Sequence, residues 1–145
     1  MEVREFHTED VIQLVPLMDQ LGYPTSLGKL ESRLNNIQSQ SNYHTLVAEL
    51  NNKIVGMVGL CHNLFYEYDN SYVRIVALVV DANYRRKGIG KKLMHEAEKW
   101  ATGQGASYIM LNSGNRAERK AAHKFYHDMG YESKSTGFSK LLDKY

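Results

Sequence analysis

The sequence predicts an α/β fold: a mixed, mostly antiparallel sheet of about six to seven strands, flanked by about four helices. Strand-like and helix-like segments alternate along all 145 residues. Two apolar strands joined by a two-residue turn predict an antiparallel hairpin, and a later strand, helix and strand predict a right-handed crossover that makes one strand pair parallel. The length is that of roughly one domain, so we expect a single domain over residues 1–145.

The first half of the chain predicts three strands and two helices. Thr8 and Ser26 are residue types that cap the first turn of a helix, and apolar residues follow Ser26 at helical spacing. Asn51 and Asn52 tolerate the positive φ angles of a tight hairpin. In order, the expected elements are a strand at 2–6, a helix at 8–21, a helix from Ser26 to about residue 37, and strands at 44–50 and 54–65.

The second half predicts the crossover and the remaining strands. The unbroken apolar run Ile75–Val80 favours a central strand that is buried on both faces. The expected elements are a strand at 72–80, a helix at 88–103, a strand at 108–111, a helix at 116–129 and final strands at Tyr131 and 138–142. Because the last of these is an edge strand, a homodimer is a possible assembly.

Composition excludes several classes of protein. A net charge of +2 gives no broad basic face, so we expect no nucleic-acid partner. The run Ile75–Val80 is far shorter than the roughly 18 residues that span a bilayer, and the charged residues Glu2 and Arg4 do not fit a signal peptide. We therefore expect a cytoplasmic protein with no membrane partner. The single cysteine, Cys61, excludes an internal disulfide and a cysteine-based zinc site.

Residues 79–91 have the pattern of a phosphate-binding loop. A buried strand ends, glycines follow and a helix begins, so unpaired amides and the positive end of a helix dipole point at one place. Four cations, Arg85, Arg86, Lys87 and Lys91, exceed what one phosphate requires and suit a pyrophosphate. The alternative is a tight turn whose charges are simply solvated.

Two familiar phosphate-binding motifs do not match this loop. The dinucleotide fingerprint requires glycine where Leu93 stands, and the nucleotide P-loop requires serine or threonine where Lys92 stands.

A third motif does match. Arg85, Gly88 and Gly90 follow an apolar strand, and a later helix carries Phe125-Tyr126 before Gly130-Tyr131. This pattern resembles the GNAT superfamily of acyl-CoA-dependent N-acetyltransferases over essentially the whole chain. The additional residues Ser113, Gly114, Arg116, Ala122, His123, Phe138 and Lys140 are most similar to small-molecule amine acetyltransferases such as the aminoalkylphosphonate N-acetyltransferases.

The resemblance implies acetyl-CoA as co-substrate, bound beside the parallel strand pair. It implies that backbone groups at the end of the 72–80 strand contact the pantetheine arm, and that the loop amides hold the pyrophosphate. The implied cofactor-binding residues are Leu78, Val79, Val80, Arg85, Arg86, Lys87, Gly88, Ile89, Gly90, Lys91 and Asn115. Tyr126 is implied as the catalytic acid, because a phenol is protonated at neutral pH and can donate to the departing thiolate. On residue type alone, Tyr126 equally fits a packed helical aromatic.

The acceptor and the general base stay open. Candidate acceptor contacts are Tyr23, Glu67, Arg74 and His123. Arg74 favours an anionic group if it faces the site and is a solvated cation if it does not. The aromatic and acidic loop at 65–69 instead favours a cationic amine.

No acidic residue lies between Tyr72 and Val80, where many relatives carry one. Glu49, Glu67, Asp69 or His62 acting through water are the alternatives, or the amine loses its proton before binding.

Two other sets of residues have types that could form a chemical site. His123 and His127 share a helix face but have no third ligand, so no metal is expected. Cys61 as an acetyl acceptor is disfavoured, because the neighbouring His62 points to the opposite face of the strand.

The sequence thus predicts transfer of an acetyl group from acetyl-CoA to a primary amine of a small molecule, by direct attack in a ternary complex. The alternatives are a protein or peptide N-acetyltransferase and a non-catalytic acyl-CoA-binding module.

Overall fold

The computed structural model describes residues 1–112, 120–134 and 137–143. The chain divides into two compact units, Met1–Leu111 and Asn112–Tyr145. The first unit holds a five-stranded sheet in the order β1-β2-β3-β4-β5. Its elements are β1 (Glu2–Glu5), α1 (Val11–Leu21), α2 (Leu27–Gln38), β2 (Tyr43–Leu50), β3 (Lys53–Leu64), β4 (Ser71–Val80), α3 (Ile89–Gly103) and β5 (Tyr108–Leu111), with short 3-10 turns at Thr8–Asp10 and Ala82–Tyr84.

The sheet is mixed as predicted. The first three strand pairs are antiparallel, and β4 pairs with β5 in parallel. Asn51 and Asn52 make the β2–β3 turn with φ angles of 51° and 65°. The predicted hairpin and crossover are therefore confirmed.

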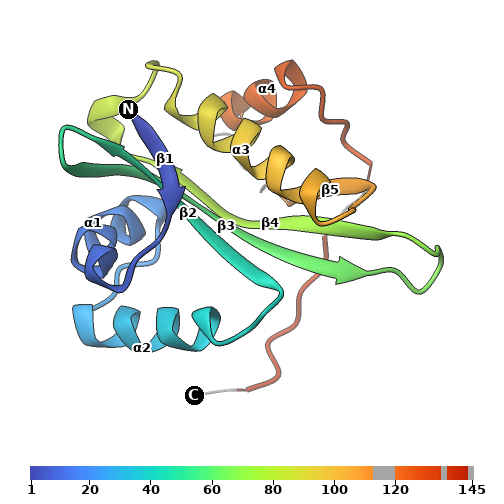
Figure 1. Cartoon of the computed structure of the whole chain (residues 1–145), viewed down its shortest axis with the longest axis horizontal. Helices are drawn as coiled ribbons and strands as arrows, with labels where there is room; N and C mark the ends of the chain where they lie inside the picture. Colours follow the sequence, from blue (N-terminus) through green and yellow to red (C-terminus); the bar gives the residue numbers. More distant parts are fainter. Residues whose placement is uncertain (113–119, 135–136, 144–145) are drawn as a thin grey trace. The chain divides into compact units, whose positions relative to one another are not determined.

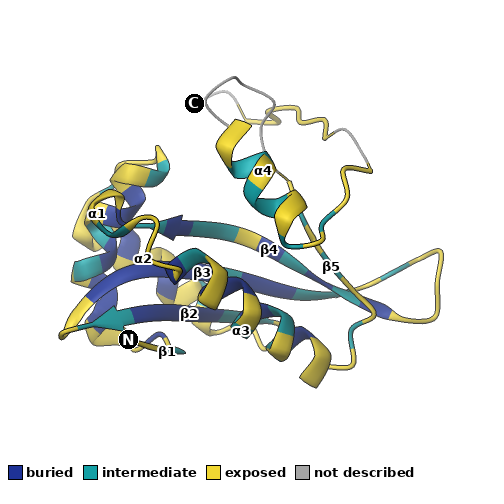
Figure 2. Ribbon diagram, turned by 90° about the horizontal axis from the view of Figure 1, so that it is seen from above, coloured by how far each residue is buried: buried dark blue, intermediate teal, exposed yellow. Residues whose placement is uncertain are grey.

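Helices cover both faces of this sheet (Figure 1). On one face, α1 and α2 close a core with inward residues of β2, β3 and β4, such as Val47, Met57 and Val79. On the other face lies α3, whose buried residues are Ile89, Leu93, Met94, Ala97 and Ala101. Figure 2 shows the resulting dark, buried stripe along β2 and β3.

The second unit contains one described helix, α4 (Lys120–Asp128). It was expected from residue 116, but 116–119 lie outside the described residues. After it, Gly130 adopts a φ of 93° and its amide donates to the carbonyl of His127 (3.0 Å).

The prediction of six to seven strands is wrong, because the sheet has five. The described residues at 131–134 and 137–143 form no strand. Phe138 and Leu142 are 94% and 91% exposed. An apolar alternation forms a strand only where a neighbouring strand accepts its backbone hydrogen bonds, and the described part of this unit offers none.

The position of β4 also differs from the prediction. The middle strand of the order is β3, and Val76 in β4 is 53% exposed. The pairing with β3 shifts so that Gly59 faces Ala77 and Leu60 faces Ile75, which leaves Val76 as an extra residue in a bulge.

Candidate active site

The loop that follows β4 is fixed to the sheet through Asp81. Its amide donates to the carbonyl of Val55 in β3 (2.8 Å), and its buried carboxylate accepts from the amide of Asn83 (3.0 Å). Lys53 Nζ lies 3.7 Å from Asp81 Oδ2. The capped turn Ala82–Tyr84 therefore starts the loop at a defined place.

The backbone of the loop presents free amides to solvent. Arg86 and Gly88 adopt φ angles of 64° and 79°, and Gly88 is the N-cap of α3. No described residue accepts a hydrogen bond from the amides of Arg86 through Lys91. The first amides of a helix have no partner within the helix and lie at the positive end of its dipole, so this segment can bind an anion.

Four cations lie in the loop and the first turn of α3, next in sequence to these amides. Arg85, Arg86, Lys87 and Lys91 are all exposed, and none forms an ion pair with a carboxylate in the described ranges. Lys87 lies over the ring of Tyr84, with Nζ 5.6 Å from the centroid. The charges are available to a ligand with several phosphates.

The end of β4 carries an open edge next to this loop. β4 is ten residues long, but β5 has four and pairs only with Tyr72–Ile75. No described strand pairs with residues 76–80 on that edge, which includes Leu78, Val79 and Val80. Unpaired strand edges offer amides and carbonyls to another extended chain, so this edge can pair with the pantetheine arm.

The faces of β4 follow from its neighbours. Val80 pairs with Gly56, whose position contacts Leu93 and Ile89 of α3. Leu78 therefore faces α3 as well, whereas Val79 belongs to the core beneath α1 and α2.

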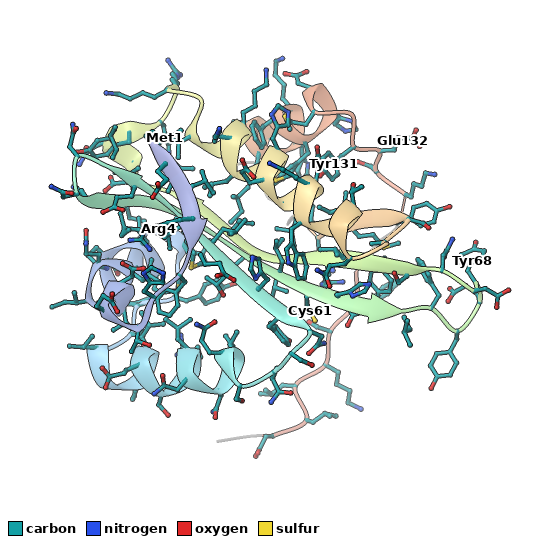
Figure 3. All side chains as sticks on the ribbon, viewed as in Figure 1. Met1, Arg4, Cys61, Tyr68, Tyr131 and Glu132 are labelled. Carbon is teal, nitrogen blue, oxygen red and sulfur yellow. The ribbon has the colours of Figure 1, made fainter. Side chains whose placement is uncertain are left out.

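The candidate acceptor residues lie apart in the first unit. Arg74 is half-buried on β4, and Tyr23 is 68% exposed after α1. Glu67 is exposed at the tip of the β3–β4 hairpin, near the Tyr68 labelled in Figure 3. Since β4 begins at Ser71 and rises about 3.3 Å per residue, Glu67 is more than roughly 20 Å along the strand from Leu78.

Of the other candidate general bases, Glu49 is bound to another residue, His62 lies on the face of the sheet opposite Arg74, and Asp69 lies in the hairpin tip. Glu49 accepts from Arg4 Nε at 3.0 Å. His62 lies on the α3 face, where its Nε2 is 2.8 Å from Ser71 Oγ and its ring meets Trp100 edge-on. Asp69 is exposed in the same hairpin tip as Glu67.

The second unit holds the remaining predicted residues. Tyr126 is half-buried on α4, with its ring 5.4 Å from Phe125 and 6.2 Å from Tyr131. His123 is half-buried on the same helix. Asn115 lies outside the described residues.

Comparison with known proteins then assigns the family. Residues 11–131 match the model of the acetyltransferase (GNAT) family, which spans most of the chain. The chain belongs to this family. It is an acyl-CoA-dependent N-acetyltransferase, and enzymes of the family generally use acetyl-CoA as co-substrate.

Individual relatives agree with this assignment. The acetyltransferase is 29% identical over 133 residues to an uncharacterized N-acetyltransferase of Bacillus subtilis, covering 91% of this chain and 92% of that protein. It is 40% identical over 86 residues to N-acetylaspartate synthetase of Xenopus tropicalis, covering 59% of this chain and 30% of that protein.

Solved structures share the fold. A GNAT family acetyltransferase of Staphylococcus aureus is 37% identical with a TM-score of 0.84, covering 97% of this chain and 98% of that one. An aminoglycoside acetyltransferase from an uncultured soil sample, in complex with trehalose, is 25% identical with a TM-score of 0.80, covering 98% of this chain and 96% of that one.

The acetyltransferase carries loop contacts that the sequence did not predict. Gln20 of α1 accepts from the amide of Ala82 (2.7 Å), and Lys53 of β3 lies over the Tyr84 ring (5.0 Å). Neither residue belongs to a motif, because both reach the loop only through the tertiary fold.

The described part of the acetyltransferase contains no group of three or more His, Cys, Asp and Glu residues arranged to hold a metal. Among its described helices, none is long and apolar enough to cross a membrane.

Proposed function

We propose that this acetyltransferase transfers an acetyl group from acetyl-CoA to a primary amine of a small molecule, by direct attack in a ternary complex. The observation that carries the proposal is the open edge of β4 at residues 76–80, which leads into the unpaired amides and cations at the start of α3. An extended arm that ends in a pyrophosphate has the chemistry to use both features. The pyrophosphate binds Arg85, Arg86, Lys87, Gly88, Ile89, Gly90 and Lys91, and the arm binds Leu78, Val79 and Val80.

The reaction follows from this placement. The amine lone pair attacks the thioester carbonyl carbon and forms the C–N bond, the C–S bond breaks, and the thiolate takes a proton. A backbone amide of β4 stabilises the oxyanion, and Tyr126 donates a proton to the departing sulfur. The proton that the amine nitrogen loses as the adduct collapses passes through solvent and restores the Tyr126 phenol. Since β2 residues 43–48, β3, β4 and β5 carry no carboxylate, the amine loses its proton to solvent before attack.

The names of the relatives support a small acceptor. One is an aminoglycoside acetyltransferase, and another is an N-acetylaspartate synthetase. Both names describe small acceptors or products, which favours a small amine over a protein N-terminus. Asn115 remains a predicted contact to the cofactor.

The loop assignment is tested with Gly88→Val. A β-branched residue resists a φ of 79°, so the substitution disturbs the α3 N-cap and raises the KM for acetyl-CoA. Gly105→Val is the matched control, because Gly105 has a φ of 80°, equally open space and a place beyond the other end of α3. Both variants lose stability to a similar extent. An unchanged affinity of Gly88→Val for acetyl-CoA overturns the assignment.

The activity is tested by thiol release from acetyl-CoA over a panel of amino acids, aminoalkylphosphonates, polyamines, aminoglycosides and short peptides. Tyr126→Phe is expected to lower kcat by about 100-fold or more on the best acceptor. Tyr131→Phe, which removes a phenol five positions away, stays within about twofold of the wild type. Turnover confined to peptides, or saturable acetyl-CoA binding with no turnover, contradicts the proposal.

A further inference from the structure

One face of the sheet carries a cation for which the described residues provide no partner. Arg74 of β4 pairs in register with Cys61 of β3 and Met110 of β5, and Cys61 pairs with Tyr43 of β2. Registered partners point to the same face, so these four side chains form one row across four strands. We call them the Arg74 row. Cys61 is labelled on this part of β3 in Figure 3.

The Arg74 row lies on the face opposite α3. His44 and His62, the neighbours of Tyr43 and Cys61 along their strands, both meet the Trp100 ring of α3. Because side chains alternate along a strand, the Arg74 row points to the α1 and α2 face.

None of the described residues supplies a counter-charge to Arg74 on that face. It is half-buried, and within the part of the chain that the structure describes it forms no hydrogen bond and no ion pair. Arg4 is a contrast in the same unit: it donates to both oxygens of Asp10 (2.8 and 2.9 Å) and to Glu49 (3.0 Å). A guanidinium stays charged at every accessible pH, so partial burial without an anion is unfavourable.

The surroundings of Arg74 are neutral and polar. Cys61 Sγ is 3.3 Å from Asn42 Nδ2 and 3.4 Å from Asn63 Oδ1. The pKa of Tyr43 is raised, first by the electrostatic influence of the neighbouring Cys61 and then by a hydrogen bond to it, which keeps the phenol protonated. Asn42, Asn63 and the protonated Tyr43 therefore carry no negative charge that would repel an anion.

Arg74 lies on the same strand as the proposed thioester position, so an anion bound to it would be near the reacting group. The bulge at Val76 separates Arg74 from the open edge at residues 76–80, where the thioester lies in the proposed function. A small molecule held at Arg74 is therefore within a few strand positions of the acetyl group.

We propose that the acceptor is a small amine that also carries an oxyanion, and that Arg74 binds this anion. This inference rests on the proposed function and specifies its substrate class. A planar carboxylate matches the guanidinium fork with two parallel hydrogen bonds, so amino acids are preferred to phosphonates.

The test compares acceptors that share a primary amine on a short carbon chain and differ in the group at the other end. β-Alanine, β-alaninamide, propylamine and 2-aminoethylphosphonate are assayed by thiol release with wild type, Arg74→Gln, Arg74→Lys and Arg33→Gln. Arg33 is exposed on α2 and is not part of the Arg74 row, so its substitution removes the same charge from a different element. Unfolding midpoints in urea show whether each variant is folded.

The expected result is selective. Wild type has a lower KM for β-alanine than for its amide, and Arg74→Gln raises the KM for β-alanine by about 10- to 100-fold while leaving that for the amide unchanged. Arg74→Lys retains part of the preference, and Arg33→Gln retains all of it. A lower KM for 2-aminoethylphosphonate than for β-alanine keeps the anion site but overturns the preference for carboxylate.

Two results overturn the inference while the proposed function stands. One is equal KM values for acid and amide in the wild type, and the other is an equal rise for both in Arg74→Gln. If no amine is turned over, the proposed function fails, and calorimetric binding of β-alanine to the CoA-bound enzyme decides the inference alone. Binding that Arg74→Gln abolishes supports it, and the absence of binding overturns it.

Discussion

Arg4 adds side-chain contacts to the backbone pairing that joins the N-terminal strand to the first unit. Its guanidinium bridges Asp10, in the turn before α1, and Glu49 at the end of β2. Arg4 is labelled in Figure 3. The hydrogen bonds from Arg4, together with the amide of His7, hold the pKa of Asp10 below its ordinary value. The folded state therefore binds this proton more weakly than the unfolded chain does.

This difference predicts a pH dependence of stability. The contribution of Asp10 is fully present above its unfolded pKa of about 4 and is lost as pH falls through its lower folded pKa. Asp10→Asn is expected to lower the free energy of unfolding by about 2 kcal/mol at pH 7 and by less at pH 3, measured by urea denaturation. Glu9→Gln, whose carboxylate is exposed, is the control. An equal loss for Asp10→Asn at both pH values contradicts this account.

The roles of individual residues were predictable where they depend only on neighbours in the sequence. Ser26 caps α2 by accepting from the amide of Lys29 (3.3 Å), and the asparagine turn has its expected φ angles. The contact of Gln20 with Ala82 was not predictable, because the two residues are 62 positions apart and their contact depends on how α1 packs.

At the scale of elements, β3 packs closely against α3 at Gly56. A Cβ added there meets Leu93 Cδ1 at 3.0 Å, the Val79 carbonyl at 3.2 Å and Ile89 Cγ2 at 3.3 Å. Since Ile89 and Leu93 belong to the first turns of α3, this contact also positions the loop amides. The close approach of α3 to β3 therefore requires glycine at position 56, and this approach matters for the site as well as for the core.

Gly56→Ala is expected to move the start of α3 away from β3. The free energy of unfolding falls by about 1–3 kcal/mol, as for other overpacked cores, and the KM for acetyl-CoA rises. Gly28→Ala in α2 is the control: its Cβ meets nothing within 4 Å, and alanine favours a helix, so stability increases slightly. Thermal unfolding and steady-state kinetics measure the two effects. An unchanged KM for acetyl-CoA in Gly56→Ala shows that the packing at Gly56 does not position the loop amides.

Element types were predictable from periodicity, but neighbours were not. The strands and helices before residue 112 occur where the apolar spacing placed them. The apolar run in β4 indicated burial on both faces, yet the bulge turns Val76 outward. The alternation at 138–142 indicated a strand, yet no strand forms at those described residues. The sequence pattern shows which side chains are apolar, whereas the pairing of a strand depends on which segments lie beside it in the fold.

At the scale of the whole molecule, charge is concentrated where the cofactor is proposed to bind. The net charge is only +2, but residues 85–92 contain five cations and no acid. The motif allowed this loop to be predicted as a phosphate site. The expected strands at 72–80 and 108–111 already differ in length, but which end of β4 stays open depends on the register of its pairing with β5, which no pattern in the sequence indicated.

The cluster predicts a salt dependence that is specific to the phosphates of the donor. Exposed charges are screened as the Debye length falls from about 10 Å at 0.1 M salt to about 3 Å at 1 M. The KM for acetyl-CoA is therefore expected to rise several-fold as sodium chloride is raised, whereas that for S-acetylpantetheine, which has no phosphate, stays constant. Lys91→Gln weakens the dependence, and Lys99→Gln, which removes an exposed charge from the other end of α3, does not. An equal salt effect on both donors indicates instead that ions act on the acceptor or on the fold, and the loop then has no electrostatic part in binding the donor.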